Sequence, residues 1–358
     1  MKALLLAGEQ SGMIYAEALK AILAQKGVET RGFADYGFKV SDMAVMGILP
    51  VIMKLPYFLR VIRTMKRAMI EWRPDVVCTV DYPGMNLKLS AYAKSLGIRT
   101  VHVVSPQVWA WKKGRIPRIE RSLDSLMCFF PFEPALYKPG FAHFAGHPLC
   151  EMAEADASAR PREKGFVAIL PGSRLGEISR NLPVMLEALG KLKGVRAEIP
   201  AANPAARKAI EAMLATSGAK NCTVLDGNAR SILARAEVAA VASGTATLEA
   251  ALLKCPTVLV YRVNALFAFL ARRFIKEIKH VGLANIVWEK MVPGNEDYPM
   301  PELLQEDFTA EALASLLGEW LENPDAKARI VARLEAACAL LRTEGGALER
   351  IAREITKG

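Results

Sequence analysis

The chain has 358 residues, of which 52% are hydrophobic, and a formal net charge of +10. This length suits about two domains, and the apolar content excludes a disordered chain. The excess of 47 Lys and Arg over 37 Asp and Glu favours an anionic partner: nucleic acid, an anionic membrane surface or a phosphorylated substrate. Aromatic residues make up only 7%, and no run of five like charges occurs, so a nucleic-acid groove built on base stacking is not supported.

The six cysteines and four histidines do not form a metal-binding pattern. None of the cysteines stands in a C-x-x-C pair, and their density is too low for a disulfide framework. No D-x-D triplet occurs, so we expect neither a metal nor another cofactor. The apolar start at Lys2–Ala7 is too short for a signal peptide, and no charge-free run is long enough to span a bilayer. We expect a cytosolic protein, with membrane contact left open.

The first half of the chain alternates strands with helices. We predict strands at Lys2–Ala7, Asp75–Val80, Thr100–Val104 and Leu126–Phe130, and helices at Ser11–Gln25 and Leu87–Ser95. Such alternation forms parallel, right-handed βαβ units. Residues 155–164 are polar and aperiodic. We therefore predict that they link a first domain, residues 1–154, to a second domain, residues 165–339.

The alternation starts again after this linker. We predict strands at Phe166–Leu170, Val195–Ile199, Cys222–Leu225, Val238–Ala242 and Thr257–Val260, and a helix at Glu177–Leu192. The predicted fold class is α/β, with two doubly wound Rossmann-like domains that face each other and bind ligands in a cleft at the strand C-termini. A final helix from Ala310 is interrupted at 345–346, which would let its last part, about residues 340–358, cross back to the first domain.

The turn after the fourth of these later strands has the form of an anion site. Ser243, Gly244 and Thr245 precede a helix-like run, so backbone N–H groups and the helix dipole would face a bound anion. Thr245 and Thr247 add hydroxyl donors, and Glu249 could accept hydrogen bonds from a sugar diol. Phosphate beside ribose indicates a nucleotide. An ordinary N-capped helix is the alternative interpretation.

Arg174 lies in a second turn of this kind, P-G-S-R at 171–174, between a strand and a helix. A guanidinium there can clamp a diphosphate through two hydrogen bonds. The alternative is an exposed surface arginine. Two turns suited to phosphate in one domain favour a nucleotide site more than either turn alone.

Three polar residues follow predicted strands of the first half. Asp81 ends a buried strand, where ligands of parallel sheets bind, and it could act as a general base on a hydroxyl. The alternative is an aspartate that opens the turn at Pro83. Glu9 and Ser11 follow the first strand, where both a ligand contact and a helix cap by Ser11 fit the sequence.

Two further patterns fit either binding to a ligand or membrane, or ordinary packing in the core. Trp109 and Trp111 lie on the same side of an extended segment beside basic residues, so they could hold a sugar or a lipid headgroup, or anchor the core. Residues 43–70 and 264–279 combine apolar and basic side chains. Such stretches can lie on an anionic membrane, and the alternative is a core-facing helix with a solvated basic face.

The chain resembles the lipid-A-disaccharide synthases, because its motifs occur in the same order as theirs. These enzymes are glycosyltransferases of the GT-B fold, with two Rossmann-like domains. The first half matches at A-G-E-x-S-G (7–12), M-A-V-M-G (43–47), D-x-P-x-x-N (81–86), S-P-x-V-W-A-W (105–111), P-F-E (131–133) and G-H-P-L (146–149). The second half matches at L-P-G-S-R-x-x-E-I (170–178), A-S-G-T-A-T-L-E-A-A-L (242–252), Y-R (261–262), G-L-x-N-I (282–286) and P-E-L-L-Q (301–305).

The resemblance implies an inverting transfer from UDP-2,3-diacylglucosamine to 2,3-diacylglucosamine 1-phosphate, which gives a lipid A disaccharide 1-phosphate and UDP. It makes Asp81 the candidate base, with Glu9 as a second catalytic residue. It implies that substrate is bound by Arg174, Ser243, Gly244, Thr245, Thr247, Glu249, Asn285, Gln305, Ser11, Asn86 and Trp109. It also implies a peripheral protein of the inner membrane in lipopolysaccharide synthesis, no nucleic-acid partner, and a possible homodimer with exchanged C-terminal parts.

The chain departs from the family pattern at several positions, mostly on the acceptor side of the first domain. Met13 and Gly84 stand where the family has Asp, and Gln107 and Ala284 also differ. A Gly-Gly-Pro segment is missing, and the segment between Asn285 and P-E-L-L-Q is unusual. The alternatives are therefore a paralogue for another sugar nucleotide or lipid acceptor, a non-catalytic UDP-sugar-binding protein, and a membrane-surface binding module.

Overall fold

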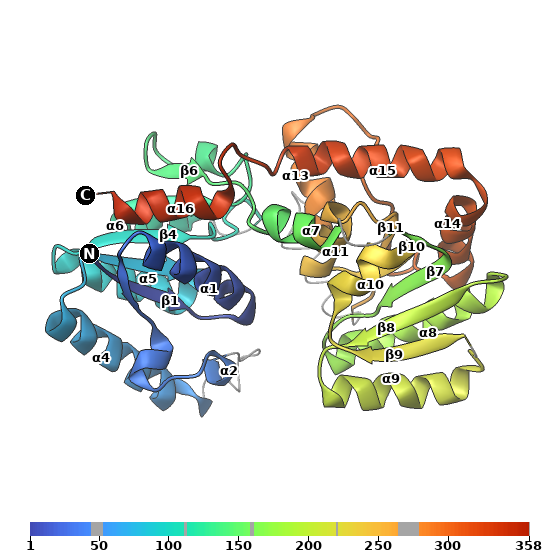
Figure 1. The fold of residues 1–358 in the computed structure, drawn as a ribbon, viewed down its shortest axis with the longest axis horizontal. Coiled ribbons are helices and arrows are strands. Elements are labelled where there is room, and N and C mark those ends of the chain that lie inside the picture. Colours follow the sequence, from blue (N-terminus) through green and yellow to red (C-terminus); the bar gives the residue numbers. More distant parts are fainter. Residues whose placement is uncertain (44–52, 111–112, 158–160, 220, 264–278, 358) are drawn as a thin grey trace. The chain divides into compact units, whose positions relative to one another are not determined.

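The structure is a computed structural model, which describes residues 1–358 apart from 44–52, 111–112, 158–160, 220, 264–278 and 358. The chain divides into two compact units, Met1–Pro148 with Arg342–Gly358, and Leu149–Leu341. Each unit is built on a parallel six-stranded sheet with its own helices (Figure 1). The predicted α/β class with two doubly wound sheets is confirmed.

The first unit begins with strand β1 and closes with the C-terminal helix. Its elements are β1 Lys2–Ala7, α1 Gln10–Gln25, β2 Glu29–Arg31, η1 Phe33–Tyr36, α2 Val40–Met43, α4 Leu55–Trp72, β3 Val76–Val80, α5 Pro83–Ser95, β4 Arg99–Val103, η2 Lys113–Arg115, α6 Ile116–Ser122, β5 Ser125–Cys128, η3 Pro134–Leu136, β6 Ala142–Phe144 and α16 Ala347–Thr356. The strand order is β2-β1-β3-β4-β5-β6, and every pairing is parallel.

Alternating side chains of β1 explain why this sheet is covered on both faces. Leu4 and Leu6 pack into one core cluster with Met65 of α4 and Leu89 of α5. Leu5 points to the opposite face, where α1 lies, because successive residues of a strand face opposite sides. Strands buried on both faces are continuously apolar, and this is the pattern that made them recognisable in the sequence.

The C-terminal helix α16 packs against the first unit, as the sequence predicted. It contacts α1 and β4. The Arg99 guanidinium donates to the Glu354 carboxylate at 2.8 Å and to the Glu354 backbone carbonyl at 2.7 Å. Glu354 is only 7% exposed, so this contact fixes the helix to the start of β4. At the other end of the helix, Lys26 of the first unit pairs with Glu349 at 2.6 Å.

The second unit repeats the architecture. Its elements are α7 Leu149–Ala157, β7 Glu163–Leu170, α8 Leu175–Lys191, β8 Arg196–Ala201, α9 Pro204–Ser217, β9 Cys222–Asp226, α10 Ala229–Arg235, β10 Ala236–Ala242, α11 Thr245–Leu252, β11 Thr257–Tyr261, α13 Leu283–Met291, β12 Glu302–Leu304, α14 Ala310–Glu322 and α15 Pro324–Ala339. The strand order is β12-β11-β10-β7-β8-β9. All seven residues of the central strand β10 are buried.

The C-terminal segment is not one helix with a single interruption. The sequence predicted a helix from Ala310 onward that is broken only at 345–346, and the structure has three helices there. α14 ends at Glu322, where the Asn323 side chain accepts hydrogen bonds from the backbone N–H groups of Asp325 and Ala326 and caps α15. A proline at the first position of α15 prevents α14 from continuing, because proline lacks the N–H that a helix interior requires.

A buried polar cluster joins the loops that follow β4 and β5 in the first unit. Glu133 is 1% exposed. Its carboxyl accepts hydrogen bonds from the Trp109 indole N–H at 3.2 Å and from the Phe130 backbone N–H at 3.1 Å. Nearby, the hydroxyls of Ser105 and Tyr137 are 3.0 Å apart. Burial raises the pKa of Glu133 to about 8, and the Phe130 and Trp109 donors oppose this rise.

We expect Glu133 to make the first unit less stable as the pH rises. The folded pKa is about 8, whereas an unfolded glutamate has a pKa of about 4.3. The folded state therefore holds the proton more tightly, and about 5 kcal/mol of stability is lost as the pH rises from the unfolded to the folded value. Glu133→Gln removes the ionisable group, so the thermal stability of the variant relative to the native protein should increase from pH 5 to pH 9. The matched control is the exposed Glu71→Gln; a constant difference between native protein and Glu133→Gln across this pH range would contradict the prediction.

Candidate functional site

The carboxyl edge of the first sheet carries strained backbone. Asp81 and Tyr82, directly after β3, both have φ of +51°, and Val104, directly after β4, has φ of +75°. Positive φ is rare for residues other than glycine and is most unfavourable for a β-branched residue such as Val104. Strain of this kind persists only where surrounding contacts impose it, and it concentrates at functional sites.

The Asn86 side chain contacts the strained turn that follows β3. This side chain is fully buried, and its amide NH₂ group lies 2.7 Å from the Asp81 carbonyl, 3.2 Å from the Val80 carbonyl and 3.3 Å from the Leu6 carbonyl. The amide therefore joins the ends of β1 and β3 to the turn that carries Asp81. Sequence matching assigned Asn86 to substrate binding, and its amide group is engaged with the backbone.

The Asp81 carboxyl is half-buried, and the turn sets its orientation. Its Oδ1 accepts a hydrogen bond from the Tyr82 N–H at 2.7 Å. Burial raises the pKa of Asp81, and the Tyr82 N–H opposes this rise. An ionised carboxyl with a raised pKa is a better proton acceptor than an ordinary aspartate, which is the property that a general base needs.

Glu9 lies beside this turn. A Cβ added to Gly8 would be 2.6 Å from the Tyr82 side chain, so the loop after β1 runs directly against the turn after β3. Glu9 is exposed, and its charge contributes, after burial, to the raised pKa of Tyr82. Ser11 lies in the first turn of α1, and the backbone carbonyl of Glu9 accepts the Met13 N–H at 2.9 Å. The structure thus brings Glu9 and Asp81 to adjacent loops of one edge.

Trp109 lies at the same edge but inside the protein. It is 7% exposed, its indole N–H donates to Glu133, and its ring contacts Phe132 edge to face. This placement fits the core-anchor alternative better than a stacking surface for a sugar. Trp111, the other half of the predicted pair, lies outside the described residues.

The second unit has a cavity of about 430 Å³ at the carboxyl edge of its sheet. It is lined by the loops that follow β7, β9 and β10, which include Pro171–Arg174, Gly227–Asn228 and Ser243–Ala246. The two turns that the sequence marked as suited to phosphate therefore line the same cavity. Ligands of open parallel sheets bind at such edges, and a volume of this size suits a small-molecule site.

The turn at Ser243–Thr245 presents the N-terminus of α11 to the cavity. Gly244 has φ +151° and ψ −166°, a conformation that only glycine adopts readily. The exposed Thr245 opens the helix. Thr247 is 1% exposed, and its hydroxyl donates to the Gly244 carbonyl at 2.7 Å. Thr247 therefore stabilises the turn, while Ser243 and Thr245 remain at the cavity wall.

At the turn Pro171–Arg174, the carboxylate of Glu177 lies at the N-terminus of helix α8. Its carboxylate accepts hydrogen bonds from the backbone N–H groups of Ser173 at 3.2 Å and Arg174 at 3.4 Å. It also lies 2.5 Å from the Arg174 guanidinium. An internal carboxylate thus fills the anion position of α8, and the N-terminus of α11 is the one left for a ligand. The Arg174 side chain is 59% exposed, so it can reach a phosphate from the cavity wall.

Glu249 lies one turn further along α11 and pairs with Arg230 at 2.8 Å. Both side chains are mostly buried, at 17% and 23% exposed. The sequence predicted that Glu249 accepts hydrogen bonds from a ribose. The ion pair orients the carboxylate, and the ribose contact stays a prediction.

Asn285 and Gln305 both lie beside β12, the edge strand of the second sheet. The buried Asn285 amide bonds to both backbone groups of Met300, at 2.8 and 3.0 Å, and to the Glu302 carboxylate at 2.8 Å. Gln305 has φ of +52°, and its carbonyl accepts from Arg262 at 3.3 Å. Asn285 therefore holds β12 against α13, and its contact with a donor stays a prediction.

Several lining residues were not identified from the sequence. Asn228 has a positive φ of 61°, and with Gly227 it forms the third loop of the cavity. The signal available was the D-G-N turn at the end of β9, which has the composition of many surface turns. Glu177 was placed in a helix and in the matched motif at 170–178, but nothing in its spacing revealed that it would bind the preceding turn.

The described part of the chain contains no group of three or more acidic, histidine or cysteine side chains arranged to hold a metal ion. Within the same residues no helix is both long and apolar enough to cross a membrane. The first basic amphipathic stretch corresponds largely to α4, which exposes Leu55, Leu59 and Ile70. The second stretch falls almost wholly on 264–278, outside the described residues.

The chain matches one known protein family along almost its whole length. Over residues 3–355 the chain matches the family model of lipid-A-disaccharide synthetase. The lipid-A-disaccharide synthase of Alcanivorax borkumensis is 34% identical over 378 aligned positions, which cover 99% of this chain and 96% of that protein. The enzyme of the same name from Xylella fastidiosa is 39% identical and covers 80% of this chain and 77% of its own.

Solved structures with the same architecture are more distant in sequence. UDP-GlcNAc 2-epimerase from Neisseria meningitidis, bound to UDP-GlcNAc, superimposes with a TM-score of 0.67 at 12% identity and covers all of both chains. MurG from Acinetobacter baumannii gives 0.59 at 14% identity, with 100% of this chain and 99% of MurG covered. At this identity the likeness shows the fold alone, and it is the predicted GT-B fold. Together with the match along the sequence, it establishes that the chain belongs to the lipid-A-disaccharide synthase family of glycosyltransferases, which act in lipid A biosynthesis.

Proposed function

We propose that the protein transfers a diacylglucosaminyl group from UDP-2,3-diacylglucosamine to 2,3-diacylglucosamine 1-phosphate, with inversion at the anomeric carbon. The products are the β-1,6-linked disaccharide 1-phosphate and UDP. The observation that carries this proposal is the strained turn at Asp81, which presents a half-buried carboxyl with a raised pKa at a sheet edge. The family membership supplies the substrate class.

In this mechanism Asp81 is the general base. It accepts the proton of the acceptor 6-hydroxyl as the oxygen attacks the anomeric carbon of the donor. Attack from the face opposite the leaving group forms the new C–O bond while the bond to UDP breaks, which inverts the configuration. Glu9, on the adjacent loop, places a negative charge near Tyr82, the residue after Asp81, and we assign it to acceptor binding and to support of the base.

The second unit binds the leaving group. Negative charge grows on the UDP diphosphate as the glycosidic bond breaks, and donors fixed in advance stabilise such charge most effectively. The N-terminus of α11 supplies the backbone N–H groups of Gly244 and Thr245, and Arg174 supplies a guanidinium at the wall of the same cavity. Arg174 would exchange its Glu177 partner for the diphosphate. The Glu249 carboxylate suits the ribose hydroxyls.

We further propose that the protein works in the cytoplasm as a peripheral protein of the inner membrane, because both substrates are lipids. The exposed face of α4 supports this: it presents Leu55 and Leu59, which are 51% and 44% exposed, next to the exposed Arg60 and Arg63. Apolar side chains beside basic ones suit a surface of anionic lipid. A homodimer is part of the proposal, and the C-terminal helix is the part that would exchange.

The first prediction concerns the base. Asp81→Asn keeps the shape of the side chain but cannot accept the proton, so kcat should fall by about 10² to 10⁴ while UDP binding stays unchanged. Product formation is measured by mass spectrometry and UDP binding by calorimetry. Asp75→Asn, at the opposite end of β3, is the matched control and should keep full activity. Turnover that survives in Asp81→Ala would rule out the assignment of the base.

The same prediction has a pH signature. Activity requires the ionised carboxylate, so the rate should fall as the pH drops through the pKa of Asp81. Because burial raises this pKa, the midpoint of the acid limb should lie above the usual aspartate value of about 3.9. The measurement is kcat against pH with saturating substrates. An acid limb at or below the ordinary value would show that another group controls it.

The second prediction concerns the leaving group. Arg174→Ala removes a charged donor to the diphosphate, and a hydrogen bond to a charged group contributes about 1.5 to 3 kcal/mol. UDP should therefore bind roughly 10-fold to 100-fold more weakly, as measured by calorimetry at fixed salt concentration. Arg329→Ala, an exposed arginine of α15 that does not line the cavity, is the matched control. Equal UDP affinities of the two variants would exclude Arg174 from the site.

The third prediction concerns the membrane. Arg60→Gln with Arg63→Gln removes two charges from α4, and each basic residue near an anionic surface contributes about 1 kcal/mol. Binding to vesicles of phosphatidylglycerol and phosphatidylcholine should fall about 10-fold or more at low salt, as measured by co-sedimentation, while UDP binding stays intact. Arg329→Gln serves as the control. Unchanged sedimentation of the double variant would exclude α4 as the contact surface.

A further inference from the structure

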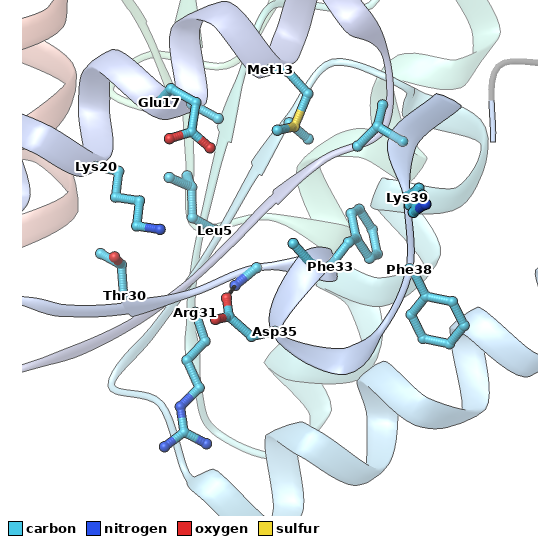
Figure 2. A pocket seen from close by; sticks show the side chains of 15 residues that line it. Leu5, Met13, Glu17, Lys20, Thr30, Arg31, Phe33, Asp35, Phe38 and Lys39 are labelled. Atoms are coloured by element: carbon cyan, nitrogen blue, oxygen red, sulfur yellow. Dashed lines mark hydrogen bonds between the residues drawn. The ribbon is translucent and has the colours of Figure 1, made fainter. Parts of the chain in front are cut away.

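The first unit contains a second cavity, of about 180 Å³, between α1 and the segment Thr30–Val40 (Figure 2). α1 contributes Met13, Ala16, Glu17 and Lys20, which recur at the three- and four-residue spacing of one helix face. Figure 2 shows Met13 and Glu17 above Leu5 of β1 and Lys20 beside it, whereas Arg31 and Phe38 extend away from them. The acceptor chemistry proposed above does not use this cavity.

The inner wall of the cavity is apolar. Leu5, Ala7, Ala16 and Phe33 line it, and each is less than 8% exposed. Met13 adds a flexible thioether side chain that adapts to irregular apolar shapes. A dry apolar cavity of about 150 Å³ takes a ligand of benzene size, so this one has room for a hydrocarbon segment of roughly six carbon atoms.

The rim of the cavity is charged. Glu17, Lys20, Asp35 and Lys39 surround it. The Asp35 carboxylate is occupied locally, because it accepts the Gly32 N–H at 2.7 Å. In the part of the chain that the structure describes, neither Lys20 nor Lys39 forms a salt bridge. A hydrocarbon wall below two available ammonium groups suits an acyl chain whose carbonyl and phosphorylated headgroup stay at the rim.

The cavity lies next to the turn that carries the base. Gly12, the residue before Met13, is packed so closely against β3 that an added Cβ would lie 3.4 Å from the Val80 carbonyl. Val80 directly precedes Asp81. At the other side of the same loop, Gly8 contacts Tyr82. Ala7, which lines the cavity, also pairs with Val80 in the sheet, so one end of the cavity wall lies beside the strand end that carries Asp81.

We propose that this cavity binds part of an acyl chain of the acceptor, the diacylglucosamine 1-phosphate whose hydroxyl reacts at Asp81. The inference rests on the proposed function and adds to it the place where the chain of the acceptor is recognised. Met13 then contributes to chain selectivity, because its thioether forms the movable part of an otherwise fixed apolar wall.

The test is the dependence of kcat/KM on acceptor chain length, with a fixed donor and soluble acceptors that carry butanoyl, hexanoyl or octanoyl chains. In the native protein each methylene that enters the cavity should raise kcat/KM about threefold to fourfold. Met13→Lys places a charge in the apolar wall, so it should lower kcat/KM at least 10-fold for the longer chains and leave the butanoyl acceptor almost unaffected. Ala16→Met fills the cavity with an apolar side chain and should move the optimum to shorter chains.

The matched control is Ile14→Lys, on the same helix, which introduces the same charge at a residue that is 43% exposed and does not line the cavity. Its chain-length profile should equal that of the native protein. A profile that stays unchanged in both Met13→Lys and Ala16→Met, with product still formed, would overturn this inference and leave the proposed function standing. No product from any acceptor would instead contradict the proposed function. A second series varies the donor chain with a fixed acceptor, and variants that change only this donor profile would show that the assignment to the acceptor is wrong. Thermal melting confirms that each variant is folded.

Discussion

The first unit depends on one buried amide. Asn86 donates to the carbonyls of Leu6, Val80 and Asp81, and these groups end two neighbouring strands and begin the turn to α5. Two consecutive residues at positive φ cost about 1 to 3 kcal/mol each, and hydrogen bonds to a side chain that water cannot reach offset this cost. Because Tyr82 is one of those residues, its N–H points back to the Asp81 carboxyl. The position of the candidate base thus follows from a contact that lies beneath it.

In the second unit, other residues hold the corresponding turn between a strand and a helix. Its strand also ends at a turn before a helix, but the conformation there belongs to Gly244, and Thr247 rather than an asparagine holds the turn. A glycine turn leaves backbone N–H groups uncovered at the helix N-terminus, which suits an anion. The first edge instead presents the carboxyls of Glu9 and Asp81. Two parallel six-stranded sheets therefore carry opposite chemistry, acid groups for a hydroxyl in one and donors for a diphosphate in the other.

The sequence predicted the long strands and missed the short ones for a physical reason. Strands buried on both faces are continuously apolar, whereas the three-residue strands β2, β6 and β12 have too few side chains to show any period. Motif order located the turns of both sites. It could not distinguish side chains that face a ligand from those that hold a turn: Asn86 and Thr247 are conspicuous in the motifs, yet their donor groups are engaged with the backbone. That distinction depends on where a side chain points, which spacing along the chain does not encode.

Two carboxyls at the edge of the first sheet show how burial separates their roles. Glu133 is almost completely covered, and its pKa of about 8 keeps it largely protonated near neutral pH. It can hold Trp109 and Phe130 in place but has no route to a substrate proton. Asp81 is covered only in part, so its pKa is raised while the carboxyl still reaches solvent. A group that must take a proton from a bound hydroxyl needs both properties, and the turn held by Asn86 gives them to Asp81.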